Sequence, residues 1–378
     1  MGAAMSSQCF RLPAVLTLGC LLASASCGDE EDDAAGNVGV LGGGGGAGGS
    51  GSSLAGAGGS SPSRAGAGSG GAPAVSTPDA GRTTCDTISP RVLAEELPDE
   101  NASLAGLSFT GDIAAFVDTA LARRYPFGLE LVRGGRMNPA LDDCSVTFGE
   151  PASSAAEVYS VMEVIVHECG HLHDDNLSSG NRSVYDLHAD LRFQCERGDS
   201  TSRGGDTFAR SRIVTDPFQD ARRPCAVSGA RGCDSYAPIY LDGNPDDATF
   251  EGGDQGFSLL MEEAVQYVNS IATAWAFADQ KPRNRTISAR DGILTFLWYI
   301  ERYLRMARTD FPGAYARITG DDCWRELTLS VWTRAQRYLE LTDSEATLGI
   351  EDEVIEQLVN EPELLEEIER LRELEDCP

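Results

Sequence analysis

Histidine is scarce in this chain, and its few copies are clustered. The sequence has 378 residues and four histidines, His167, His171, His173 and His188, which all lie within one short region. Histidine is the commonest protein ligand for metals. Clustering alone does not establish a metal site, but it directs attention to the stretch VIVHECGHLHDD, Val164 to Asp175.

Basic residues are also few, because 30 lysines and arginines face 59 aspartates and glutamates, for a formal net charge of −29. An anionic surface repels phosphate, so this balance argues against nucleic acid as a partner. Most of these charges are expected to form a solvated surface. We find no internal repeat, so a repeat architecture is not expected.

The apolar run near the N-terminus, LPAVLTLGCLLASA, follows Arg11 and is too short for a comfortable membrane span. A basic residue followed by a short apolar run and small residues is typical of a bacterial secretory signal. The sequence ASASC resembles a lipobox, although Ser24 stands where leucine is usual. We therefore expect residues 1–27 to be a lipoprotein signal peptide that ends at a lipidated Cys27. Ordinary signal-peptidase cleavage after Ala25 is the alternative.

Residues 28–82 begin with an acidic patch and continue as Gly/Ser/Ala-rich low complexity. Such a composition cannot bury a core, so we expect a disordered, flexible tether. A tether after a lipidated cysteine favours an exported protein at the cell envelope, lipid-anchored to the outer membrane or cell surface. Its only membrane contact would then be the lipid anchor. A freely secreted protein is the alternative.

Cysteine usage agrees with export, because eight cysteines follow Cys27 and an even number in an exported chain predicts disulfides. Cys225 and Cys233 flank a short glycine-containing loop and form one plausible pair. Cys323 and Cys377 bracket the C-terminal helices and form another.

The spacing of His167 and His171 favours the binding of one metal ion by both side chains. The two residues are one helical turn apart, so both imidazoles project from one helix face and can share one Zn²⁺. Glu168 follows directly, where it could accept a proton from a water that the metal activates. The pattern HExxH is short and also arises by chance. It therefore indicates a metal site only where it lies on a helix whose opposite face is buried.

That helical context is present. Ser154 and Glu157 form a capping-box pattern that predicts a helix start. At about 100° per residue the histidines share one face. The opposite face is apolar: Val158, Met162, Ile165, Cys169 and Leu172. Cys169 is therefore expected to be a buried thiol or a disulfide partner. His173 is rotated off the ligand face and is expected to hydrogen-bond or to be solvated.

The segment VIVHECGH resembles the active-site helix of the zincin metalloproteases. A catalytic zinc needs a third protein ligand. The metzincin extension is excluded because Asp174 and Leu177 occupy its glycine and histidine positions. The segment EAVQYVNS resembles the third-ligand helix of lethal-factor-type gluzincins, which implies that Glu263 is the third ligand. Tyr267 stands where thermolysin-type gluzincins place an aspartate.

Helical phase distinguishes the two adjacent glutamates of this segment. It places Glu263 at the edge of the apolar face and Glu262 nearly opposite, in solvent. Three other residues stay open as rivals for the third ligand: His188, Asp186 and Asp190.

The fold that these features predict is α+β. We expect one zinc metallopeptidase-like domain over residues 83–378, with a zincin-like α+β lobe at 83–255 and a mostly α-helical lobe at 256–378. A helix should end before Pro126. A small sheet should precede the metal helix, with FGLELVRGG and CSVTFGE as strands, and residues 176–254 should be irregular. Five further helices are predicted at 257–277, 288–307, 322–341, 351–359 and 363–374.

The function implied by the resemblance is that of a zinc-dependent endopeptidase acting on a peptide or protein substrate, with Glu168 as general base. Four tyrosines are candidates for a transition-state donor: Tyr185, Tyr236, Tyr240 and Tyr267. The alternative is a non-catalytic zinc-binding surface lipoprotein that serves adhesion or protein interaction.

Overall fold

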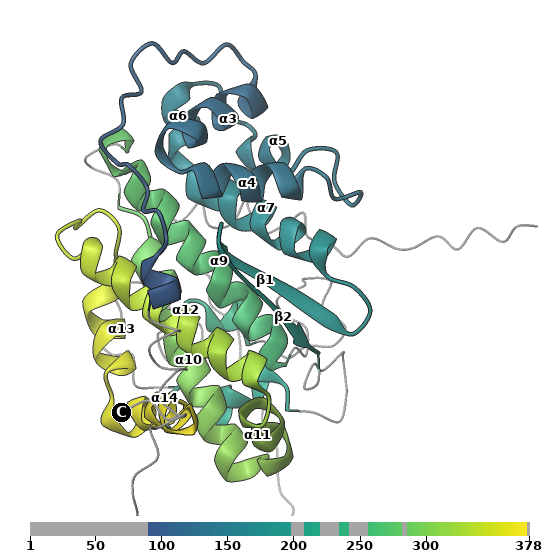
Figure 1. Cartoon of the computed structure of the whole chain (residues 1–378). Helices are drawn as coiled ribbons and strands as arrows, with labels where there is room; N and C mark the ends of the chain where they lie inside the picture. Colours follow the sequence, from purple (N-terminus) through teal and green to yellow (C-terminus); the bar gives the residue numbers. More distant parts are fainter. Residues whose placement is uncertain (1–89, 198–207, 220–233, 242–255, 282–285, 376–378) are drawn as a thin grey trace, which may run out of the picture. The chain divides into compact units, whose positions relative to one another are not determined.

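The computed structural model of this chain describes residues 90–197, 208–219, 234–241, 256–281 and 286–375. The predicted signal peptide, Cys27, the tether and the pair Cys225–Cys233 lie outside these residues. All described residues belong to one compact unit. It is mostly helical with a two-stranded sheet (Figure 1), so the predicted α+β class is confirmed at this level.

Short helices precede the metal-motif helix and gather at one end of the unit (Figure 1). They are α3 (Ile113–Arg124), α4 (Pro126–Gly135), α5 (Cys144–Gly149) and α6 (Ala155–Ser160). The predicted helix before Pro126 is confirmed as α3, whose N-terminus is capped by the Asp112 carboxylate accepting from the Ala115 N–H at 3.0 Å.

The two strands predicted before the metal helix are wrong, because FGLELVRGG lies in α4 and CSVTFG forms α5. Pro126 at the first position of α4 is well suited to a helix start, and buried Phe127, Leu131 and Val132 repeat with helical period. In α5 the Asp143 carboxylate accepts from two backbone N–H groups and caps the helix. Capping and packing thus override the β-propensity of Val146, Thr147 and Phe148.

The metal motif lies on α7 (Met162–Leu177), which is separated from α6 by a break at Val161. The Ser154 hydroxyl accepts from the Glu157 N–H at 3.3 Å, so the predicted N-cap is confirmed. The Glu157 carboxylate accepts from the Ser153 backbone and hydroxyl instead of from Ser154. The cap therefore starts α6, and the histidine-bearing helix α7 begins only after this six-residue helix.

The sheet follows the metal helix instead of preceding it. Strands β1 (Arg182–His188) and β2 (Leu191–Glu196) form an antiparallel hairpin inside the region predicted to be irregular. Strand β2 alternates buried and exposed residues, with Leu191, Phe193 and Cys195 inward. This alternation over 191–196 was the available sequence signal.

The C-terminal part is helical, and all five predicted helices are confirmed with small shifts at their ends. They are α9 (Phe257–Ala276), α10 (Ala289–Asp310), α12 (Asp322–Leu341), α13 (Asp352–Val359) and α14 (Pro362–Leu374). Helix α11 (Pro312–Thr319), the short helix α8 (Ala237–Tyr240) and the 3₁₀ turns Arg210–Thr215 and Ala278–Gln280 were not predicted.

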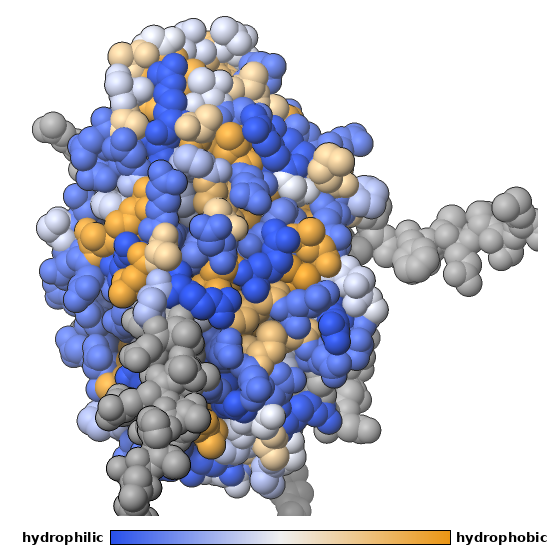
Figure 2. Space-filling view, in the orientation of Figure 1, coloured by the Kyte–Doolittle hydropathy of each residue, from blue (hydrophilic) through white to orange (hydrophobic). Residues whose placement is uncertain are grey.

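Helix α9 lies at the centre of the unit, packed against α7 on one side and α10 on another (Figure 1). Helix α7, which carries the metal motif, and helix α9, which carries Glu263, thus come from either side of the expected boundary at residue 255. Among the described helices, none is long and apolar enough to cross a membrane. The face shown in Figure 2 is largely hydrophilic, with apolar residues in small groups, in keeping with the acidic composition.

Within the described residues, two disulfides join distant elements. Cys144–Cys169 fixes α5 to the metal helix, and Cys195–Cys323 fixes β2 to α12. Cys169 is thus a disulfide partner, as its apolar position predicted, whereas the pairing of Cys323 with Cys377 is wrong. Closing the loop between Cys144 and Cys169 stabilises the fold by about 3.5 kcal/mol in the chain-entropy description. Structural disulfides of this kind are compatible with an exported protein.

Candidate metal centre

Helix α7 faces α9 closely at the centre of the motif. A side-chain Cβ added at Gly170 would lie 2.0 Å from Gln266 Oε1 of α9, so only glycine fits there without a shift. This close approach places His167 and His171 opposite Glu262, Glu263 and Ser270. The glycine in HECGH thus has a packing role, because it sets the spacing of the two helices that carry the candidate ligands.

Three candidate ligand atoms form a small triangle. The Nε2 atoms of His167 and His171 are 3.0 Å apart, and Glu263 Oε2 lies 3.5 Å from each. Ligands about 2.0–2.1 Å from a tetrahedral ion are separated from one another by about 3.3 Å. The triangle therefore has the size that a single tetrahedral zinc ion requires.

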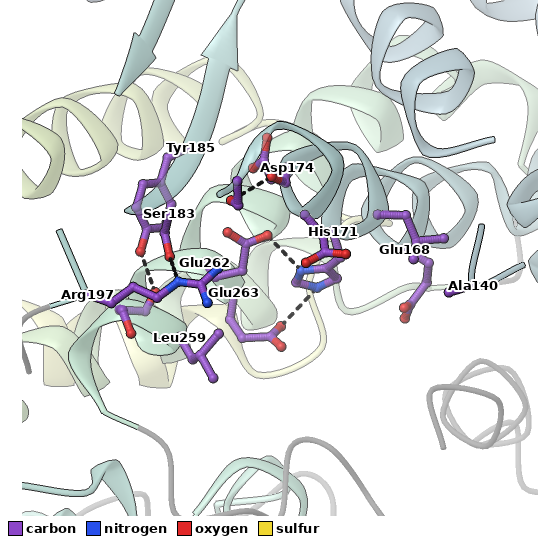
Figure 3. A pocket seen from close by; sticks show the side chains of 14 residues that line it. Ala140, Glu168, His171, Asp174, Ser183, Tyr185, Arg197, Leu259, Glu262 and Glu263 are labelled. Carbon is purple, nitrogen blue, oxygen red and sulfur yellow. Dashed lines mark hydrogen bonds and ion pairs between the residues drawn. The ribbon is translucent and has the colours of Figure 1, made fainter. Parts of the chain in front are cut away.

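The other nitrogen of each imidazole has a partner. His171 Nδ1 lies 3.0 Å from Glu262 Oε1, and His167 Nδ1 lies 3.0 Å from the Ser270 hydroxyl. A carboxylate only accepts, so His171 donates from Nδ1, which in the neutral ring leaves Nε2 as an acceptor or ligand. Figure 3 shows His171 between Glu262 and Glu263, with contacts to both. The expectation that Glu262 lies in solvent is therefore wrong, because this residue orients a candidate ligand.

The buried negative charge of this cluster favours a bound cation. Glu263 is only 2% exposed, and its Oε2 atom has no hydrogen-bond partner among the described residues. Burial raises the pKa of Glu263, but the attraction of His171 and His167 outweighs it and holds the pKa below its ordinary value. Burial lowers the pKa of His171, yet Glu263 and Glu262 raise it well above its ordinary value. Without a metal, a proton on His171 would supply the missing positive charge.

Glu168 is buried beside the triangle and has no place among its ligand atoms. Burial raises its pKa, and the charge of Glu263 adds to this effect, while His167 and His171 act in the opposite direction. Burial alone makes this carboxylate a stronger base than an exposed one, and a cation bound at the triangle would lower its pKa again.

A pocket of about 230 Å³ adjoins the triangle and is lined by Glu168, His171 and Glu263 on one wall. Strand β1 contributes Ser183 and Tyr185 to the lining. Figure 3 shows this pocket with Glu168 on one side of His171 and the hairpin residues on the other. The pocket is therefore bordered by both the candidate base and two candidate ligands.

The rival third ligands lie away from the triangle. His188 donates from Nε2 to the Arg91 carbonyl at 3.0 Å, and the Asp190 N–H donates to its Nδ1. Asp186 lies 3.0 Å from His173 and also pairs with Arg192. Of the candidates that the sequence left open, only Glu263 is brought to His167 and His171.

His173, Asp174 and Asp186 form a second buried group in which metal ligation is geometrically possible. Asp186 is already bound by His173 and Arg192. Asp174 accepts from the Asp186 N–H at 3.2 Å and from Gln266 Nε2 at 3.0 Å. These contacts give both carboxylates partners within the protein. The group therefore serves to attach the hairpin to α7. The expectation that His173 hydrogen-bonds and does not join the triangle agrees with this placement.

The four candidate tyrosines occupy different places. The Tyr267 ring packs edge-on against His167 with centroids 4.7 Å apart, and its hydroxyl lies 2.8 Å from that of Tyr240. Tyr185 lines the pocket, but its hydroxyl donates to the Ser258 carbonyl at 2.9 Å. The Tyr236 hydroxyl is directed to the Ser288 carbonyl. None of these hydroxyls contacts the triangle in the described structure.

Comparison with models of known families, with curated proteins and with solved structures finds no match for this chain.

Proposed function

We propose that this protein is a zinc-dependent endopeptidase of gluzincin-like type, with His167, His171 and Glu263 as the metal ligands. The observation that carries the proposal is the triangle of two Nε2 atoms and one carboxylate oxygen with edges of 3.0–3.5 Å. The buried Oε2 atom of Glu263, which has no hydrogen-bond partner among the described residues and faces only the two imidazoles, supports a cation at this point. Nitrogen and carboxylate donors suit zinc.

A bound zinc ion would supply Lewis-acid polarisation of a carbonyl and of a water molecule. The residues of the chain provide the rest. Glu168, buried at the edge of the pocket, accepts the proton of the attacking water and passes it to the leaving amine. Glu262 holds His171 in the tautomer that leaves Nε2 free to ligate.

The substrate is proposed to be a peptide or protein, because the pocket beside the triangle admits a side chain while the candidate base borders it. We further propose that the protein acts at the cell envelope, held by a lipid on Cys27. Loss of palmitate-analogue labelling in Cys27→Ala would support this anchor, and an unlabelled wild type with Ser26 as mature N-terminus would contradict it.

The test of the peptidase proposal is cleavage of casein and of a peptide library by the full chain, with and without a chelator. We expect cleavage that the chelator abolishes and that added zinc restores. Glu168→Gln should be inactive, whereas Glu130→Gln, at an exposed position on α4, should match the wild type. Stoichiometric zinc without cleavage of any substrate would favour the non-catalytic zinc-binding surface lipoprotein instead.

A further inference from the structure

The pocket beside the triangle is mostly lined by apolar and acidic groups, with one cation. Leu172, Leu259 and Ala140 supply apolar walls. Arg197, directly after β2, is the positively charged residue among the described lining residues apart from the histidine of the triangle. Figure 3 shows its guanidinium on the side of the pocket away from Glu168.

The carboxylates of the lining are already engaged. Glu168 and Glu263 belong to the proposed catalytic site, and Glu262 is bound to His171. Asp174 accepts from Gln266, and Asp175 accepts from Asn138 Nδ2 at 3.1 Å. No ion pair of Arg197 with a described carboxylate is present.

Arg197 is held in place without using its outer donors. Its Nε atom donates to the Ser183 hydroxyl at 2.8 Å, and its backbone N–H donates to the Asn181 carbonyl. Within the described residues, its two terminal nitrogens make no hydrogen bond. The anchoring strands are themselves fixed by the disulfide of Cys195 to Cys323. Arg197 is exposed and lies one residue beyond β2, and these two contacts place its guanidinium along the pocket.

A guanidinium with free terminal nitrogens matches a carboxylate, because two parallel N–H groups fit its two oxygens. We propose that Arg197 binds a carboxylate of the substrate, with the apolar walls covering the part of the substrate between that carboxylate and the scissile bond. This inference rests on the proposed peptidase function. The carboxylate belongs either to an aspartate or glutamate side chain near the cleavage point, as the proposed endopeptidase requires, or to the C-terminus of the substrate, in which case the same zinc chemistry would serve a carboxypeptidase.

Binding measurements separate these two sources and do not depend on turnover. The full chain, loaded with zinc, is titrated by calorimetry with two peptide pairs. The first pair is acetyl-Ala-Leu-Phe with a free C-terminal carboxylate and its C-terminal amide. The second pair is acetyl-Ala-Glu-Phe-amide and acetyl-Ala-Gln-Phe-amide. Preference within the first pair identifies a C-terminal carboxylate, and preference within the second identifies an acidic side chain.

The wild type should prefer the carboxylate member of one pair by about ten- to a hundredfold, the range expected for hydrogen bonds to a charged group. Arg197→Gln should lose that preference while keeping its zinc and its affinity for the neutral member. Arg197→Lys should retain only part of it, because an ammonium lacks the fork. Arg182→Gln is the matched control, since Arg182 is an exposed arginine of the same hairpin and is absent from the lining.

Two results would overturn the proposal. One is a wild type that does not distinguish the members of either pair, including one that binds none of them. The other is a carboxylate preference that survives in Arg197→Gln. Cleavage of the peptides is followed in the same samples, so failure of the peptidase proposal appears separately, as preferential binding without turnover.

Discussion

The contact of Gly170 with α9 gives a sharp prediction about how the site is held. In Gly170→Ala the new Cβ would lie 2.0 Å from Gln266 Oε1 and 2.8 Å from its Cδ. Ordinary van der Waals contact begins near 3.4 Å, so the two closest atoms must separate by about 1.4 Å. Gln266 cannot move away freely, because Asn269 donates to its Oε1 and its Nε2 donates to Asp174, each at 3.0 Å.

Either response to this clash has a cost. If Gln266 rotates, two buried hydrogen bonds are lost, at about 1–3 kcal/mol each. If α7 and α9 separate, overpacking costs about 1–3 kcal/mol and Glu263 moves away from the two histidines. Alanine gains about 1 kcal/mol over glycine inside a helix. We therefore expect a net loss of unfolding free energy of about 1–5 kcal/mol if Gln266 rotates and about 0–2 kcal/mol if the helices separate. Because separation moves Glu263 away from the histidines, zinc affinity should then fall by about tenfold or more.

The assay is denaturant unfolding of the full chain without metal, followed by zinc titration of the folded protein. Gly313→Ala is the control, because Gly313 also lies in a helix and nothing lies within 4 Å of its added Cβ. That variant should be unchanged or slightly stabilised. If Gly170→Ala were as stable as Gly313→Ala and bound zinc as the wild type does, the close approach of α7 and α9 would not determine the site.

Three further predictions concern carboxyl groups. Glu168→Gln should keep its zinc while peptide turnover falls by about two to four orders of magnitude, and unchanged turnover would remove Glu168 from the mechanism. Glu263→Ala should lose zinc, and Glu262→Gln should bind zinc about 10–100-fold more weakly than the wild type. Competition with a chelating dye measures both affinities. Equal zinc affinity of Glu262→Gln and wild type would show that the contact of Glu262 with His171 is unimportant. Glu301 is buried, and neither of its oxygens has a hydrogen-bond partner among the described residues. Burial, followed by the charge of Glu367, raises its pKa from 4.5 to about 10. The folded state therefore keeps a proton that the unfolded chain loses above about pH 4.5, so this group makes stability fall as pH rises toward 10. Glu301→Gln should raise the melting temperature, and its advantage should grow between pH 5 and about pH 9; a constant difference across that range would contradict the raised pKa.

The features predicted well from sequence are those that local pattern determines. The helix carrying His167 and His171 and the five C-terminal helices follow from apolar periodicity, and Cys169 was placed correctly on the buried side. Glu263 was identified from a short resemblance and from its position beside an apolar face. The structure brings it, and not His188, to the histidine pair.

Some errors arose from local signals that favoured the wrong element, and others arose where tertiary contacts decide. The β-branched and aromatic residues of CSVTFGE predict a strand, but the Asp143 cap and the disulfide of Cys144 select a helix. Glu262 is solvent-facing in an isolated helix, yet the approach of α7 brings His171 to it. The partner of Cys323 could not be derived, because pairing depends on the placement of β2 beside α12.

The central claim is that His167, His171 and Glu263 ligate one zinc ion. The most direct measurement is a crystal structure of the zinc-loaded protein with anomalous data recorded on both sides of the zinc absorption edge. We expect one anomalous peak about 2.0–2.2 Å from Nε2 of His167, Nε2 of His171 and an oxygen of Glu263. A peak at the group of His173, Asp174 and Asp186, or no peak between the histidine pair and Glu263, would contradict the claim.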